Sequence, residues 1–148
     1  MEIQPDFREL LRLFNGKQVD YRIVGAYALA FFGVPRFTGD LDILVRPDPQ
    51  NARRILDALT AFGFGDVGLS EADFLDADRM VQLGVPPVRI TLLTALNGVS
   101  ADEAFRSPEV GRFGGLLVKV IGKAAFIQNK RAMGRQRDLA DLESLDAL

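Results

Sequence analysis

The chain has 148 residues, of which 48% are apolar and 26% charged, and it contains neither Cys nor His. This length favours a single domain over residues 1–148, and the missing Cys and His exclude disulfide frameworks, thiolate or imidazole zinc sites and Ser-His triads. The formal net charge of −2 is too small to indicate a nucleic-acid-binding surface, so chemistry is left to carboxylates, hydroxyls, Lys, Arg, backbone amides or a hard metal ion.

The first half of the chain predicts alternating helices and strands. Apolar residues recur first with helical spacing and then with strand alternation, and Gly or Pro separates the segments. The expected segments are a helix over 5–16, a strand over 20–24, a helix over 26–32, a strand over 38–45 and a helix that starts after residue 48. At this last start, Asp48 is a typical N-cap residue and Pro49 suits the first helical turn.

The second half predicts another strand, a hairpin and two closing helices. The acidic stretch that ends at Asp78 is typical of a loop with a short helix. The expected segments are a strand over 88–94, one helical turn over 101–106, a hairpin of 109–113 with 116–120, and helices over 121–133 and 137–145. Gly134, between the two helices, suits the residue that follows a helix end. Together the segments predict an α/β (α+β) fold in which helices flank a mixed β-sheet.

The sequence predicts no membrane segment. Its first ten residues are acidic rather than basic, and no apolar run follows them as in a secretory signal. The longest apolar run, over 23–34, is too short to cross a bilayer. We therefore expect a cytoplasmic protein.

One block of the first half carries candidate chemistry. Gly25 stands between a strand and a helix, and the next strand carries Asp40 and Asp42. Side chains two residues apart share one face of a strand, so these carboxylates can converge on one hard cation or bridge two, with phosphate oxygens completing the coordination. Backbone N–H groups where the helix begins can bind phosphate. Arg36 can pair with the two acids or with a phosphate.

Simpler interpretations exist for each feature alone. An Asp-x-Asp pair is common on exposed strands, and a glycine at a strand–helix junction usually serves the turn. The basic segment 119–137 contains no acid and could meet phosphate or RNA. However, the spacing of Lys119, Lys123, Lys130 and Arg131 favours an ordinary exposed helix face. The order and spacing of the glycine, arginine and two carboxylates together favour a functional site.

The same block resembles the first motif of the DNA polymerase β-like nucleotidyltransferase superfamily, hG[GS] followed by a short helix and a strand with [DE]h[DE]h. It is most similar to the nucleotidyltransferases of abortive-infection toxin–antitoxin systems and their small uncharacterised relatives. Residues 88–98 resemble a strand and turn of that group, and residues 130–143 resemble its C-terminal K…GR.kD..DLE signature. The matches run from about residue 19 to residue 145, in the order of the family.

The resemblance implies transfer of a nucleoside monophosphate from a nucleoside triphosphate to a hydroxyl acceptor. Asp40 and Asp42 would be catalytic and would hold Mg²⁺, while Arg135 and Asp138 would brace the closing helices. The nucleotide-binding residues would be Gly25, Ala26, Arg36, Thr38 and Lys130. The acceptor class stays open between tRNA, a protein side chain and a small molecule, and an antitoxin partner is a further expectation.

The chain departs from the family pattern at two positions. Ala26 stands where the family has a second Gly or Ser, and Thr91 stands where it has a third carboxylate. A threonine hydroxyl is a poor substitute for an anionic metal ligand and cannot act as a base near neutral pH. The alternative hypothesis is therefore a catalytically degenerate nucleotide-binding or regulatory module in a toxin–antitoxin or defence pair.

Overall fold

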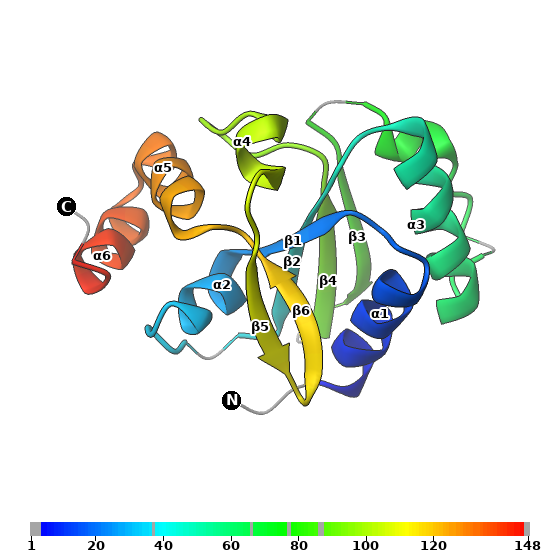
Figure 1. The fold of residues 1–148 in the computed structure, drawn as a ribbon, viewed down its shortest axis with the longest axis horizontal. Coiled ribbons are helices and arrows are strands. Elements are labelled where there is room, and N and C mark those ends of the chain that lie inside the picture. The colour runs from blue at the N-terminus through cyan, green and yellow to red at the C-terminus, as the bar shows by residue number, and fades with distance from the viewer. Residues whose placement is uncertain (1–3, 37, 66, 77, 86–87, 147–148) are drawn as a thin grey trace.

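The computed structural model describes residues 4–36, 38–65, 67–76, 78–85 and 88–146 (Figure 1). Its strands are β1 (Tyr21–Val24), β2 (Asp40–Val45), β3 (Met80–Val85), β4 (Val88–Leu93), β5 (Glu109–Phe113) and β6 (Leu116–Val120). They form one mixed sheet in the order β3-β4-β2-β1-β6-β5. β2 is central, because it runs antiparallel to β1 on one side and parallel to β4 on the other.

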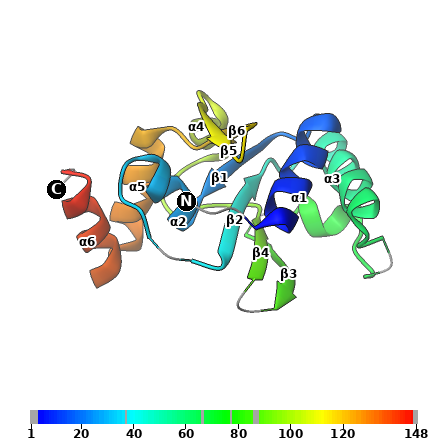
Figure 2. The same cartoon turned by 90° about the horizontal axis from the view of Figure 1, so that it is seen from below.

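Helices cover both faces of this sheet. They are α1 (Pro5–Gly16), α2 (Gly25–Phe31), α3 (Pro49–Phe62), α4 (Ala101–Phe105), α5 (Lys123–Met133) and α6 (Gln136–Ser144), with a 3₁₀ turn, η1, at Glu71–Phe74. α1 and α3 pack together on one side, and α2, α5 and α6 lie on the other (Figures 1 and 2). Among the described residues, no helix has both the length and the apolar character that a membrane crossing requires.

The alternation of β2 decides which of its side chains enter the core. Leu41, Ile43 and Val45 are fully buried in the hydrophobic cluster that includes α1 and α3. Successive side chains of a strand point to opposite faces, so Asp40 and Asp42 lie on the other face of the sheet. Burial of the apolar side fixes the register of the strand, because a shift by one residue would bring the carboxylates into the core.

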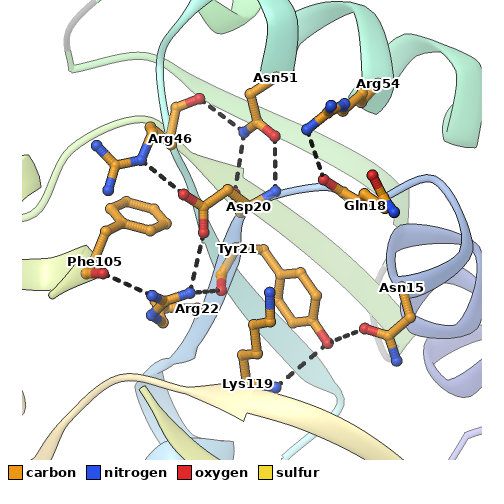
Figure 3. Close-up of polar contacts among 10 residues, drawn as sticks. All are labelled: Asn15, Gln18, Asp20, Tyr21, Arg22, Arg46, Asn51, Arg54, Phe105 and Lys119. Atoms are coloured by element: carbon orange, nitrogen blue, oxygen red, sulfur yellow. Dashed lines mark hydrogen bonds and ion pairs between the residues drawn. The ribbon is translucent and has the colours of Figure 1, made fainter. Parts of the chain in front are cut away.

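A partly buried polar network covers the sheet beyond the C-terminal end of β2 (Figure 3). The Asp20 carboxylate accepts from Arg22 Nη1 at 3.2 Å and from Arg46 Nε at 2.7 Å, while Asn51 Nδ2 donates to the Asp20 and Arg46 carbonyls. Both guanidinium groups lie over the Phe105 ring, 4.9 and 4.7 Å from its centroid. The network joins β1, α3 and α4, so this end of the sheet is covered and the end that carries the carboxylates stays open.

Most of the expected elements are present within a few residues of the predicted bounds. α5 begins at Lys123 rather than at residue 121, because the Ile121 N–H donates to the Ile23 carbonyl at 3.1 Å and keeps the chain extended alongside β1.

β3 is not predicted from the sequence. Its apolar residues do not alternate with polar ones, and Met80 and Val85 are 58% and 75% exposed. This edge strand is instead defined by its antiparallel pairing with β4.

Candidate active site

The two carboxylates of β2 line a cleft of about 560 Å³ at the open end of the sheet. In the sheet register, Asp42 lies between Val24 of β1 and Thr91 of β4, and Asp40 lies beside Arg89 of β4. The opposite wall comes from α5 and from the start of α6, through residues that include Lys130, Arg135 and Arg137. Acidic groups on the sheet therefore face a predominantly basic wall.

Gly25 allows the chain to turn directly against the Asp42 carboxylate. Its φ of +69° is left-handed, and a Cβ at this position would overlap Asp42 Oδ2 and lie 3.1 Å from the Cβ and Cγ of the same side chain. Only glycine meets both conditions without strain. The β1–α2 turn therefore brings backbone atoms of Gly25 and Ala26 into the same cleft as the carboxylates.

We expect Gly25→Ala to destabilise the fold by more than the about 1–2 kcal/mol that a left-handed alanine costs, because the new methyl group also displaces the Asp42 side chain. Gly33→Ala is the matched control, since Gly33 is also left-handed, at φ +102°, but has open space around its missing Cβ. Urea unfolding of both variants measures the difference. Equal losses of unfolding free energy would show that the contact with Asp42 is unimportant.

Asp42 is the electrostatically strained member of the pair. Burial raises the pKa of its carboxyl group above the ordinary value, and the neighbouring charge of Asp40 raises that pKa further. Arg89, Lys130 and Arg137 oppose this shift only partly. An ionised Asp42 thus carries a negative charge that its surroundings do not fully compensate, and a bound cation would relieve it.

Arg89 is already paired with the other carboxylate. Its Nε lies 3.2 Å from Asp40 Oδ1, and its backbone N–H donates to the Gly39 carbonyl at 2.9 Å. Thr38 orders the same turn, because its Oγ1 accepts from the Asp40 N–H at 3.0 Å. Strand pairing and the Thr38 hydroxyl together fix the start of β2, from which both carboxylates project.

The corner between α5 and α6 holds a buried carboxylate, Asp138. α5 ends at Gly134, with φ +63°, and α6 begins with Arg135 as its N-cap residue. The fully buried Asp138 accepts from the Arg135 backbone N–H at 3.1 Å, from Arg135 Nε at 2.6 Å and from Lys130 Nζ at 3.3 Å. These hydrogen bonds, that from Arg135 foremost, lower the pKa of Asp138 to about 2.

A second buried carboxylate, Asp141, lies one turn later on α6. Lys130 Nζ lies 3.1 Å from Asp141 Oδ2, and Arg36, from the segment between α2 and β2, pairs with the same carboxylate. Three cations therefore share two buried carboxylates, Asp138 and Asp141, which leaves the cluster with a net positive charge. The cluster also joins α6 to the segment that leads into β2.

Thr91 lies directly across from Asp42 on β4 and is 5% exposed. It therefore occupies the position on the adjacent strand at which a third carboxylate was expected from the resemblance. Among the described residues there is no group of three acidic, His or Cys side chains that could hold a metal ion. The acidic residues that line the cleft are Asp40 and Asp42 on β2 and the exposed Asp78 before β3.

The fold brings almost all of the predicted site residues together. Those that line the cleft are Gly25, Ala26, Arg36, Thr38, Asp40, Asp42, Thr91, Lys130 and Arg135, and Asp138 lies behind Lys130. The expectation that Lys130 lies on an ordinary exposed helix face is wrong. Its side chain is buried, with the residue only 9% exposed, because its ammonium group pairs with the α6 carboxylates Asp138 and Asp141. Lys119, Lys123 and Arg131 are exposed as expected.

Sequence reasoning missed two cations of the cleft, Arg89 and Arg137. Arg89 could have been found, because it alternates with Thr91 along a predicted strand and must share its face. Arg137 offered no such signal, since its position depends on the angle between two helices. Further polar residues of the cleft, Asn97 and Asn129, meet through a hydrogen bond from Asn129 Nδ2 to the Asn97 carbonyl at 3.0 Å.

Solved structures with a similar fold include nucleotidyltransferases. A protein from Thermotoga maritima classed provisionally as a nucleotidyltransferase is 16% identical, with a TM-score of 0.63 over 97% of this chain and 94% of its own. The antibiotic-resistance factor ANT(2'')-Ia is 10% identical, with a TM-score of 0.62 over 95% and 80%. The lincosamide antibiotic adenylyltransferase LnuA, solved with lincomycin, is 12% identical, with a TM-score of 0.57 over 99% of both chains.

These similarities concern the fold, because the identities are low. No protein-family model and no curated protein matches the sequence. The expected fold, a nucleotidyltransferase fold in which helices flank a mixed β-sheet, is confirmed.

Proposed function

We propose that this chain, which has the nucleotidyltransferase fold, transfers a nucleoside monophosphate from a nucleoside triphosphate to a hydroxyl acceptor. The observation that carries the proposal is the juxtaposition of Asp40 and Asp42 with the Gly25 turn and a basic wall in one cleft. Carboxylates alone would repel a triphosphate, and a basic wall alone would not distinguish a nucleotide from other anions. The two together suit a nucleotide that arrives with a divalent cation.

The residues of the cleft fit Mg²⁺ as the cation. Carboxylate oxygens are hard ligands of the kind Mg²⁺ prefers, and the raised pKa of Asp42 marks a charge that needs compensation. Asp40 and Asp42 would hold the ion, whose chemistry is to neutralise the charge that develops on phosphate oxygens. Lys130, Arg36 and Arg135 would orient the phosphates by charge and hydrogen bonds, and Gly25 would let them approach the backbone.

We propose that the acceptor binds in the same cleft. Beyond the carboxylates, the exposed side of β3 and β4 adds Met80, Gln82 and Leu93 to the lining. A hydroxyl acceptor would bind against this part of the lining. Two of the structurally similar proteins are associated with antibiotics. LnuA is an antibiotic adenylyltransferase, and ANT(2'')-Ia has been solved with adenylyl-2''-tobramycin. A small hydroxylated molecule is therefore the first acceptor class to assay, followed by tRNA and protein.

Isothermal titration calorimetry with ATP, GTP, CTP and UTP, each with and without Mg²⁺, tests the proposal. We expect at least one triphosphate to bind with a dissociation constant in the micromolar range, and binding to weaken strongly when EDTA removes the metal. Absence of heat with all four triphosphates in the presence of Mg²⁺ would contradict a nucleotide-dependent function.

A second candidate function is a nucleotide-binding module without transferase activity, acting in a toxin–antitoxin or defence pair. The position of Thr91 opposite Asp42 favours it, because a neutral hydroxyl takes the place of a metal-binding acid. Such a protein would bind nucleotide and Mg²⁺ as above but would release no pyrophosphate.

Thr91→Asp separates the two candidates. If the missing acid limits catalysis, the variant should release pyrophosphate from a bound triphosphate at least about tenfold faster than the native chain, since one well-placed catalytic group is commonly worth 10²–10⁴-fold. Thr94→Asp is unsuitable as a control, because Thr94 Oγ1 is hydrogen-bonded within the fold. Val85→Asp is the control, because it adds a similar charge at an exposed position at the other end of β3, outside the cleft. A gain in both variants, or in neither, would count against a specific role for residue 91.

A further inference from the structure

Arg89 occupies the place beside Asp40 where a cation is expected. Strand pairing sets Arg89 next to Asp40, and its Nε lies 3.2 Å from the carboxylate. In the part of the chain that the structure describes, the two terminal nitrogens of Arg89 have no hydrogen-bond acceptor. The guanidinium thus holds a carboxylate through one nitrogen and keeps two NH₂ groups for another anion in the cleft that it lines.

The net negative charge around Asp40 and Asp42 is low, because Arg89 is part of the same group. Thr91 contributes a neutral hydroxyl where a third carboxylate would add a negative charge, and Arg89 offsets one of the two carboxylates that remain. Asp40, Asp42, Thr91 and Arg89 together therefore carry the net charge of a single carboxylate. Asp78 also lines the cleft, but it is exposed, and among the described residues it forms no group of three potential metal ligands with Asp40 and Asp42. Two divalent ions in one site need several anionic ligands at close range, so this group favours one ion beside a bound triphosphate.

We propose that Arg89 takes the place of one of two metal ions, so that the site binds a nucleotide with a single divalent ion. The guanidinium would join Asp40 to a phosphate oxygen, as a bridging cation does, and the ion would bind at the Asp42 side of the pair. This inference rests on the proposed function, because it concerns the same nucleotide site. It assigns Arg89 to nucleotide binding and gives a reason why an acid is dispensable at position 91.

Native mass spectrometry with Mn²⁺ and a non-hydrolysable α,β-methylene nucleoside triphosphate tests the stoichiometry. The native chain should form a complex with one nucleotide and one Mn²⁺ even when the metal is in excess. The double variant Arg89→Gln with Thr91→Asp should bind two Mn²⁺, because it loses the internal cation and gains an acid. Arg89→Gln alone should weaken nucleotide binding about tenfold or more, since a charge-assisted hydrogen bond is lost.

Arg112→Gln is the matched control, because Arg112 is exposed on β5 and does not line the cleft. It should keep one Mn²⁺ and native nucleotide affinity. Two Mn²⁺ in the native complex, or native affinity in Arg89→Gln, would overturn the role of Arg89 while leaving the proposed function intact. A native chain that forms no Mn²⁺-dependent nucleotide complex would overturn both. Circular dichroism checks that each variant folds. We expect little loss of stability for Arg89→Gln, because a partly exposed ion pair stabilises a fold by at most about 1 kcal/mol, and this single variant tests the role of Arg89 even where the acid at the buried position 91 destabilises the double variant.

Discussion

Asp42→Asn is expected to abolish Mg²⁺-dependent nucleotide binding. The substitution keeps the shape of the side chain but removes a charge that would bind the cation directly, and loss of groups that only orient metal ligands already costs about 10–100-fold in affinity. We therefore expect a loss of at least about 100-fold for this direct ligand, measured by calorimetry with the triphosphate that binds the native chain best.

The stability of the same variant separates a functional loss from misfolding. Because the folded pKa of Asp42 is raised, ionisation of this group destabilises the native state as the pH rises through that pKa. A neutral amide avoids this cost, so at pH 7 and without metal the midpoint of thermal unfolding should stay the same or rise. Asp57→Asn, on the exposed face of α3, is the control that should change neither property. Native nucleotide affinity in Asp42→Asn would contradict the proposed metal site.

Asp138→Asn should produce the largest loss of stability. Asp138 is fully buried and accepts from Arg135 and from Lys130, which is itself 9% exposed. Removing one partner of a buried ion pair typically costs about 3–5 kcal/mol, and Asp141 still compensates part of the Lys130 charge. We expect about 3 kcal/mol, or about 10 °C in the midpoint of thermal unfolding. Glu143→Gln, exposed on the same helix, should be close to neutral.

The pH dependence of this loss identifies its cause. The folded pKa of Asp138 is about 2, against an ordinary value of 3.8, so its ionised form stabilises the native state above about pH 4. That contribution is lost as the pH falls towards 2. Urea unfolding at pH 7, 5, 4 and 3 should therefore show the gap between the native chain and Asp138→Asn becoming smaller with acid. A constant gap would assign the effect to packing instead of charge.

The geometry of the first motif could be predicted because it is local. The alternation of β2 places Asp40 and Asp42 on the face opposite the apolar residues, and the left-handed Gly25 ends β1 at a turn. The C-terminal signature is local in the same sense, since Gly134 ends one helix and Asp138 caps the next. In each case residues a few positions apart determine the geometry.

The contacts that decide how the cleft is charged are not local. Arg36 and Asp141 are 105 positions apart in the sequence, and Arg89 and Asp40 are 49 apart. Whether each cation faces solvent, phosphate or a carboxylate depends on which strands are neighbours in the sheet. It also depends on how α6 packs against α5. Lys130 illustrates this, because its helical spacing suggests exposure and yet two carboxylates bury it.

The sequence by itself determined the elements other than β3, the two carboxylates, and the exclusion of His and Cys from any site. These follow from composition, periodicity and turn chemistry, which act over a few residues. The tertiary structure alone decided that β3 completes the sheet, that Thr91 lies opposite Asp42, and that Arg89 neutralises Asp40. The physical reason is that strand order and register come from burial summed over the whole core, and no short segment carries that information.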